Sequence, residues 1–476
     1  MLTWVNSVIQ RTHIRIPLGT EPMILPNTVW AHRAALAADL PDERLESRLT
    51  AILVNTVEHP SASIPQAMDG DAGQAKATYR FYANPRVTAP ALQLGFAVET
   101  AQRSLDQDIL LVVQDTTTLN FTGLHWIPEL GPIDSGGLAR GVHLHTALAV
   151  TSSGQVIGIL DQQYWARPQR GQPGPEEKES DKWINGIDAS RAVLYQAAGE
   201  QSVPRLIHVM DREGDAYEVM MTVADAGDSA IIRCAQNRKI DDPLAKAHEA
   251  VRSQPVLCRA VVEVSRKAGV PERRAAVEVR SMRVTLVPDL QKYPHAWPMT
   301  WNLVEVWEPA PPAGTQAAHW LLWTLEPAAT ADEALEVVRK YTCRWPIEEV
   351  HLVLKSGCKV EDLRLETWDR LEKAVRVDAA VAARIVLLRD LARETPEAPA
   401  LEVLSEDEVE VLVCRFGKGM KPSELTIGQA VLWIGRLGGH LNRKRDGMPG
   451  VRTLWRGLHD LTLLAAGFRA GKRLRE

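Results

Sequence analysis

The chain has few cysteines, no long apolar run and no marked excess of one charge. Its 476 residues include five scattered cysteines, with no Cys-x-x-Cys pair and no histidine at zinc spacing: Cys234, Cys258, Cys343, Cys358 and Cys414. This argues against a disulfide framework and a structural zinc. There is no run of about 20 apolar residues, and the first residues lack the basic-then-apolar order of a signal peptide. We therefore expect a cytoplasmic protein without a membrane span.

The net charge of −5 is unevenly distributed along the chain. Residues 436–476 contain ten Lys or Arg against three acids, and residues 252–283 contain eight against three. Local basic patches on an acidic body suit a protein that holds a polyanion at chosen surfaces. Ordinary solvated surface charge is an equally good interpretation of either patch taken alone.

The length and the alternation of patterns predict an α/β protein with several domains. Residues 1–104 have a mostly helical pattern. From Asp108 the chain predicts a strand, a hairpin of two strands, a long helix over 175–199, a strand, a helix and a strand. This order is the ribonuclease-H-like arrangement. We expect such a core over 105–375, a β-rich insertion at about 236–327 and a helical C-terminal domain over 376–476.

Two acids stand at the ends of buried strand patterns. ILLVVQD ends in Asp115 and RLIHVMD ends in Asp211. In the predicted topology these strands are parallel neighbours, and functional groups of open α/β sheets gather at the carboxyl ends of the strands. Two carboxylates placed there repel each other unless a cation lies between them.

The segment YTCRWPIEEVHLVLKSG, residues 341–357, places charged side chains among bulky apolar ones. Pro346 predicts the start of a helix, because proline fits only its first turn. Helical spacing then brings Glu348, His351 and Lys355 to one face. Taken alone, this face is also well explained as a solvated stripe with favourable Glu–Lys neighbours.

Glu348 gains a chemical role when it is combined with the two aspartates. Three carboxylates, Asp115, Asp211 and Glu348, form a candidate site for two Mg²⁺ or Mn²⁺ ions, which prefer hard oxygen ligands. Such ions activate an attacking oxygen and stabilise a leaving one in an in-line displacement.

The spacing Tyr341, Arg344, Glu348, Lys355 resembles a family signature: Tyr, two residues, Arg, three residues, Glu, six residues, Lys. The signature is that of the DDE transposases of the bacterial insertion-sequence-four group. VQDTTTLNF and VMDREGDAY resemble the two catalytic strands of that family, and EEKESDKW resembles the segment before the second strand. LGGHLNRKRDGMPGVRTLWRGLHDL is similar to its C-terminal segment.

The resemblance implies a role for each matching residue. The carboxylates would hold the metal ions, and phosphate would be bound by Tyr341, Arg344 and Lys355. Trp320 in HWLLWTLEP would stack on a flipped base, although a strand Trp is more often part of the core. ATYRFYANPRV resembles the motif that contacts the transposon end, which implies end binding by Tyr79, Arg80 and Asn84.

The function implied is cut-and-paste DNA transposition by Mg²⁺-dependent strand cleavage, hairpin formation and strand transfer. The partners implied are double-stranded DNA, at the element's ends and at the target, and a second copy of the chain in a dimer that acts on the bacterial nucleoid. One alternative is a non-catalytic DNA-binding relative that inhibits transposition. Another is a metal-dependent nuclease without strand transfer.

Other polar residues near these motifs have structural interpretations. We expect Asp215 to cap the helix that follows it. His143, His145 and His208 lie in apolar strands, and we expect hydrogen-bonded core histidines rather than metal ligands.

Overall fold

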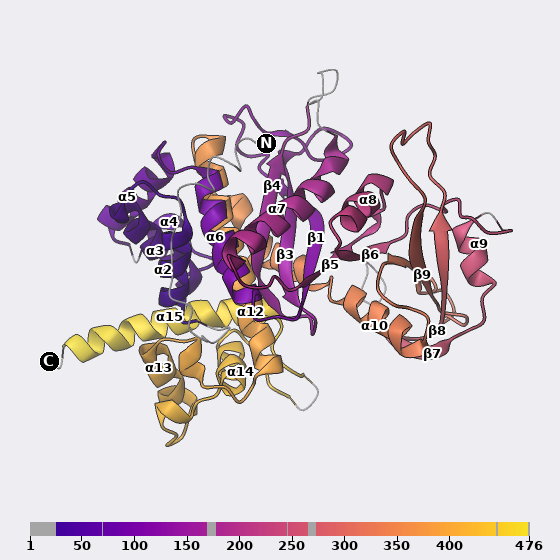
Figure 1. Ribbon diagram of the computed structural model, residues 1–476. Coiled ribbons are helices and arrows are strands. Elements are labelled where there is room, and N and C mark those ends of the chain that lie inside the picture. Colours follow the sequence, from indigo (N-terminus) through magenta and orange to yellow (C-terminus); the bar gives the residue numbers. More distant parts are fainter. Residues whose placement is uncertain are drawn as a thin grey trace.

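The computed structural model describes residues 25–68, 70–168, 178–244, 246–264, 273–443 and 446–474. Helices from both ends of the chain lie together at one end of the molecule, and the sheet extends from them to the other end (Figure 1). The predictions for residues 1–24, and for a helix start at residues 175–177, lie outside the described residues.

The N-terminal part is helical, as predicted. Its helices are α2 (Asn27–Ala37), α3 (Glu43–Glu58), α4 (Ile64–Ala67), α5 (Ala72–Ala83) and α6 (Ala89–Ser104). Asp42, Asp71 and Thr88 cap α3, α5 and α6 by accepting backbone N–H bonds, which satisfies donors that a helix start leaves free. Gly95 of α6 lets that helix pack closely on α2, because a Cβ at this position would lie 2.4 Å from the backbone oxygen of Ala34.

The core half of the sheet has the predicted order of elements. Its strands are β1 (Ile109–Asn120), β2 (Gly131–Pro132), β3 (Arg140–Thr151), β4 (Val156–Trp165), β5 (Arg205–Met210) and β6 (Ser229–Arg233). β1 is antiparallel to β3 and parallel to β5, and β5 is parallel to β6, while β4 pairs with β3. The predicted hairpin and parallel strands are therefore present.

Helices cover this half of the sheet. After a short 3-10 turn (Glu179–Asp181) come α7 (Lys182–Ala198) and, beyond β5, α8 (Tyr217–Asp225). α6, α7 and the later helix α12 (Trp368–Glu394) all pack on β4. Leu110 to Val113 of β1 are fully buried, which explains the continuous apolar run that marked this strand in the sequence.

The region predicted as a β-rich insertion extends the same sheet. It contains α9 (Ala247–Arg252), β7 (Cys258–Val264), β8 (Arg273–Leu286), β9 (Met299–Trp307) and β10 (His319–Thr324). β10 pairs antiparallel with β6, so the sheet continues from β6 through β10, β9 and β8 to β7. Figure 1 shows these strands at the end of the molecule opposite α5.

The remaining chain is helical. It forms α10 (Ala331–Thr342), α11 (Pro346–Leu352), a π-helical turn (Val353–Gly357), α12, α13 (Glu406–Phe416), α14 (Ile427–Leu437) and α15 (Val451–Arg473). α12 is 27 residues long and mostly buried, and the predicted boundary at residue 376 falls inside it. α14 and α15 pack closely, since a Cβ at Gly457 would lie 1.8 Å from the backbone oxygen of Ile434.

Within the described residues no helix combines the length and apolarity needed to cross a bilayer. The five cysteines are free thiols, three of them buried.

Candidate active site

The register of the sheet brings Asp115 and Asp211 to equivalent positions. Val113 of β1 pairs with Val209 of β5, so each aspartate lies two residues beyond a paired valine. Asp211 directly follows β5, as predicted. The prediction that Asp115 ends its strand is wrong, because β1 stays paired with β3 as far as Asn120. Asp115 instead lies at the point where β5 stops and β1 loses its parallel neighbour.

Arg344 connects Asp115 with Glu348. It lies in the turn between α10 and α11, where its Nη1 donates to Asp115 Oδ2 at 3.3 Å. Its Nη2 donates to Glu348 Oε1 at 3.2 Å, one helical turn further along. The Arg344 side chain is 14% exposed and that of Glu348 is 44% exposed. The site is therefore open to solvent on the side of α11.

Burial and mutual repulsion perturb the carboxylates. Burial, together with repulsion from Glu348 and Asp211, raises the pKa of Asp115 to about 7, although Arg344 acts to lower it. Burial also raises the pKa of Asp211, against a lowering hydrogen bond from the backbone of Glu213. Three carboxylates that interact in this way are stabilised by an added cation.

The donor set suits a hard divalent cation. In the part of the chain that the structure describes, no three His, Cys, Asp or Glu side chains are gathered closely enough to enclose a metal ion. Arg344 instead provides positive charge between Asp115 and Glu348. Three oxygen donors whose repulsion calls for positive charge fit Mg²⁺ or Mn²⁺. Binding would require Arg344 to release at least one of its two carboxylates.

Tyr341 and Lys355 flank the carboxylates in different ways. Tyr341 is in the last turn of α10, is 6% exposed, and lies 5.8 Å from the Trp320 ring, centroid to centroid. Trp320 is on β10 and is partly buried. Lys355 is in the π-helical turn, and burial lowers its pKa while Glu361 and Glu348 raise it. The predicted helix start at Pro346 is confirmed.

Two histidines bind residues next to the carboxylates or across the sheet from them. His145 on β3 lies between Thr116, with Nδ1 2.9 Å from Oγ1, and Gln114, with Nε2 3.0 Å from Oε1. His351 on α11 approaches the Thr146 hydroxyl at 3.3 Å, and Thr146 pairs with Asp115 across the sheet. Both rings thus fix elements that bear carboxylates of the site.

The other predicted polar residues have mixed outcomes. His208 pairs with Asp228 at 3.0 Å, as expected of a core histidine. His143 instead stacks on Trp165, and among the described residues its buried Nε2 has no hydrogen-bond partner. The predicted cap by Asp215 is wrong. Its carboxylate instead accepts bonds from the backbone of Ala235 and Gln236 and from Arg238, which ties the loop after Asp211 to the loop after β6.

The contact made by Glu349, the residue after Glu348, was not predicted from the sequence. Its carboxylate contacts Arg389 of α12, which is 2% exposed. Arg389 donates to Asp390 at 2.8 Å, and Asp390 accepts from the backbone N–H of Val156 at the start of β4. The two adjacent glutamates thus have different partners: Glu349 contacts α12, whereas Glu348 contacts Arg344. Only the three-dimensional structure shows which partner each glutamate has.

A second candidate surface surrounds the residues predicted to bind the transposon end. Tyr79 and Arg80 are exposed on α5 and line a hollow of about 560 Å³. Lys76 and Arg370 also line it. Lys76 lies one helical turn before Tyr79 and was recognisable by spacing, whereas Arg370 comes from α12. Asn84 lies at the end of α5, outside the residues that line the hollow, and accepts a bond from the backbone of Arg86.

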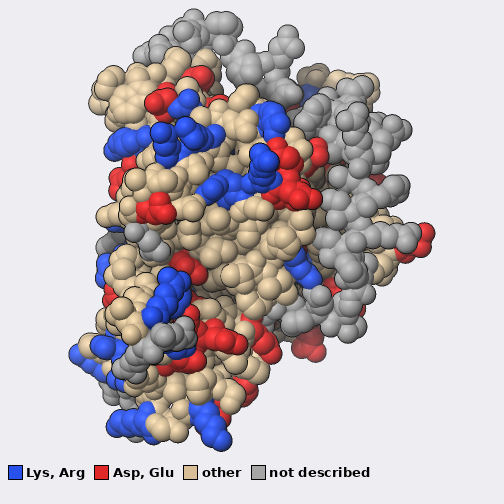
Figure 2. Space-filling model, turned by 90° about the vertical axis from the view of Figure 1, so that its left-hand side faces the viewer, with Lys and Arg blue, Asp and Glu red and all other residues tan. Residues whose placement is uncertain are grey.

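Charge on this side of the molecule is mixed. Figure 2 shows Lys and Arg in several separate groups with Asp and Glu close to them.

Two parts of the chain match known families. Residues 27–87 match the family described as Transposase DNA-binding, and residues 380–476 match the Transposase Tn5 dimerisation domain. Among solved structures, the chain is similar to a piggyBac transposase synaptic complex with hairpin DNA, with 12% sequence identity, a TM-score of 0.35, and coverage of 83% of this chain and 73% of that chain. So low a score does not establish a common fold. The two matched families lie at opposite ends of the chain, on either side of the three carboxylates in the sequence, and together they support a Tn5-like transposase.

Proposed function

We propose that the protein is a metal-dependent DDE transposase that moves an insertion sequence by a cut-and-paste route. The observation that carries the proposal is the equal register of Asp115 and Asp211, with Glu348 joined to Asp115 through Arg344. The strand order β4-β3-β1-β5-β6 supports a ribonuclease-H-like core. The matches at both ends of the chain support DNA binding and assembly as a dimer.

Each residue of the site has a defined task in this proposal. A pair of divalent cations held by Asp115, Asp211 and Glu348 would activate water and stabilise the leaving oxygen. Arg344 exchanges a carboxylate for a phosphate oxygen, which its planar fork binds well. Lys355 adds a compact positive charge from the π-helical turn.

Four successive phosphoryl displacements at one site account for the route. Water cleaves one strand at the end of the element, and the freed 3′-OH attacks the opposite strand to form a hairpin. Water then opens the hairpin, and the 3′-OH joins the target DNA. Trp320 would receive a base extruded at the hairpin step, by stacking worth about 1 to 3 kcal/mol.

The test is a cleavage assay on a labelled duplex that carries the end of the element encoding this chain. With Mg²⁺ or Mn²⁺ we expect a nick followed by a hairpin, and neither product with Asp115→Asn, Asp211→Asn or Glu348→Gln. Glu349→Gln is the matched control and should retain nicking, because Glu349 faces α12. Unchanged cleavage in the three site variants would refute the site. Nicking without any hairpin would indicate a nuclease, and end binding without nicking would indicate an inhibitor.

A further inference from the structure

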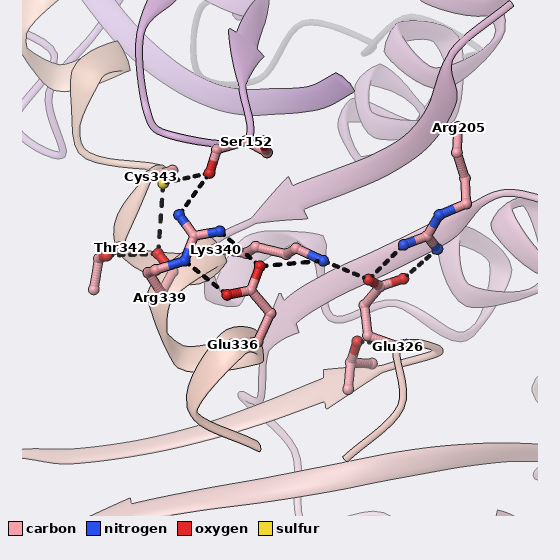
Figure 3. Close-up of polar contacts among 9 residues, drawn as sticks. Ser152, Arg205, Glu326, Glu336, Arg339, Lys340, Thr342 and Cys343 are labelled. Carbon is pink, nitrogen blue, oxygen red and sulfur yellow. Dashed lines mark hydrogen bonds and ion pairs between the residues drawn. The ribbon is translucent and has the colours of Figure 1, made fainter. Parts of the chain in front are cut away.

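Glu326 joins three elements at a buried point at the start of β5, the end of that strand opposite Asp211. It lies two residues beyond β10 and is 3% exposed. Arg205, the first residue of β5, donates to its two carboxylate oxygens at 2.6 and 2.8 Å. Lys340, in the last turn of α10, donates to Glu326 Oε2 at 2.8 Å. Figure 3 shows the carboxylate between these two cations.

Lys340 depends on this carboxylate for its charge balance. It is 5% exposed, and an ammonium removed from water requires a paired anion. Its other acidic contact, Glu336, is 3.6 Å away and 43% exposed. Burial alone would raise the pKa of Glu326, but hydrogen bonds from Arg205 and Lys340 hold that pKa down to about 2. Glu326 is thus an anion at any working pH.

Arg339, the residue before Lys340, links α10 to a different part of the sheet. Arg339 donates to both oxygens of Glu336 at 2.6 and 2.7 Å and to the backbone oxygen of Ser152 at 2.7 Å. Ser152 lies in the turn between β3 and β4. Consecutive residues of α10 are therefore tied to two different parts of the sheet (Figure 3), and this opposes rotation of the helix about its axis.

The held end of α10 leads directly into the site. Lys340 is followed by Tyr341, and Arg344 comes one turn later, where it contacts Asp115. Glu326 also binds Arg205 of β5, and the last residue of that strand precedes Asp211. Glu326 thus joins the strand before one carboxylate to the helix before the phosphate-binding residues.

We propose that Glu326 is a positioning residue that fixes Arg344 and Tyr341 relative to Asp115 and Asp211. The inference rests on the proposed function, because it concerns the rate of that reaction. Glu326 touches neither the DNA nor the reacting atoms and acts through Lys340 and α10.

The experiment compares Glu326→Gln with Glu336→Gln, which removes the exposed acidic neighbour of the same lysine. Single-turnover nicking is measured at saturating DNA and Mg²⁺, well below the melting temperature of each variant, and end binding is measured by gel shift. We expect Glu326→Gln to nick about 10-fold to 100-fold more slowly, since a misplacement of about 1 Å has effects of this size. End binding should change by less than about twofold, and Glu336→Gln should nick at a rate within about twofold of the wild type.

A double variant separates positioning from loss of folding. Glu326→Gln combined with Lys340→Met removes both buried charges, and we expect it to recover part of the nicking rate. Nicking by Glu326→Gln at the wild-type rate would overturn the inference alone. A parallel loss of nicking and end binding, with no recovery in the double variant, would overturn it as well. A wild type that binds ends without nicking them would overturn the proposed function, and the inference would fall with it.

Discussion

Arg344 is the residue on which the charge balance of the site depends. It donates to Asp115 and to Glu348 at once, so a protein site without a bound cation still has a counter-ion between its carboxylates. Charge-assisted pairs of this kind are stronger than neutral hydrogen bonds. In the proposed function, metal ions held by Asp115, Asp211 and Glu348 would leave Arg344 able to bind a phosphate oxygen. The same side chain would then pair with carboxylates in the free protein and with phosphate in the DNA complex.

Asp378 provides a pH-dependent test away from the site. Burial in α12 raises its pKa to about 8, so between about pH 4 and pH 8 the folded protein holds a proton that the unfolded chain releases. Stability of the wild type should fall as pH rises through this window, by an amount on the order of a few kcal/mol. Asp378→Asn should remove that part of the slope. Urea unfolding at pH 5 and pH 8 measures it, and equal slopes in both proteins would contradict the assignment.

Trp320 tests the base-stacking role. Because it contacts Tyr341, a substitution can also disturb packing, so Trp320→Phe is the control that keeps an aromatic ring. We expect Trp320→Ala to slow hairpin formation about tenfold or more, as loss of a stacking contact does, and to slow the first nick far less. Quantifying nicked and hairpin products over time separates the steps. Equal slowing of the first nick and of hairpin formation would contradict base stacking by Trp320.

The elements that present the site were predictable to different extents. Pro346 predicted the start of α11, and the apolar runs before Asp115 and Asp211 predicted the strands β1 and β5. The length of β1 was not predictable, because pairing with β3 extends it and that pairing is not local. The π-helical turn that contains Lys355 was not predictable either, because no residue pattern in the sequence indicates it. Such turns occur mostly as short interruptions of α-helices, often at functional sites.

The approach of α14 to α15 is a second property that a substitution can test. A Cβ at Gly457 would meet backbone at 1.8 Å, while one at Gly467 of the same helix would meet no atom of the described residues within 4 Å. Gly457→Ala should destabilise the protein by about 1 to 3 kcal/mol or more through overpacking. Gly467→Ala should stabilise it by up to about 1 kcal/mol, because alanine is the better helix former. Thermal unfolding measures both, and equal melting temperatures would refute the close approach.

The arrangement of the whole molecule joins parts of the chain that are far apart in sequence. The helical ends and the order of strands and helices from β1 to β6 were predictable from periodicity. That the β-rich insertion continues the core sheet through β6 and β10 was not, because the order of strands in a sheet depends on contacts between distant segments. For the same reason Arg370 was not recognisable beside Tyr79 and Arg80, which lie in another domain of the predicted layout.

The hollow between α5 and α12 gives a salt-dependent prediction for end binding. If Lys76 and Arg370 contact phosphate, Lys76→Gln and Arg370→Gln should each weaken end binding. Each should also lower the slope of log Kd against log salt concentration by about 1. Arg44→Gln, an exposed arginine of α3 that does not line the hollow, is the control. Salt titrations by fluorescence anisotropy measure the slopes, and equal slopes in all variants would place the phosphate contacts elsewhere.

In the proposed function, Asp115, Asp211 and Glu348 hold the metal ions of a nicking reaction. The most direct measurement replaces one oxygen ligand by sulfur, in Asp211→Cys, and compares nicking in Mg²⁺ with nicking in Mn²⁺. Thiolate is a poor ligand for Mg²⁺ and a better one for softer ions, so we predict no nicking in Mg²⁺ and partial recovery in Mn²⁺. Glu349→Cys should nick in both. Full activity of Asp211→Cys in Mg²⁺, or no difference between the two metals, would contradict the claim.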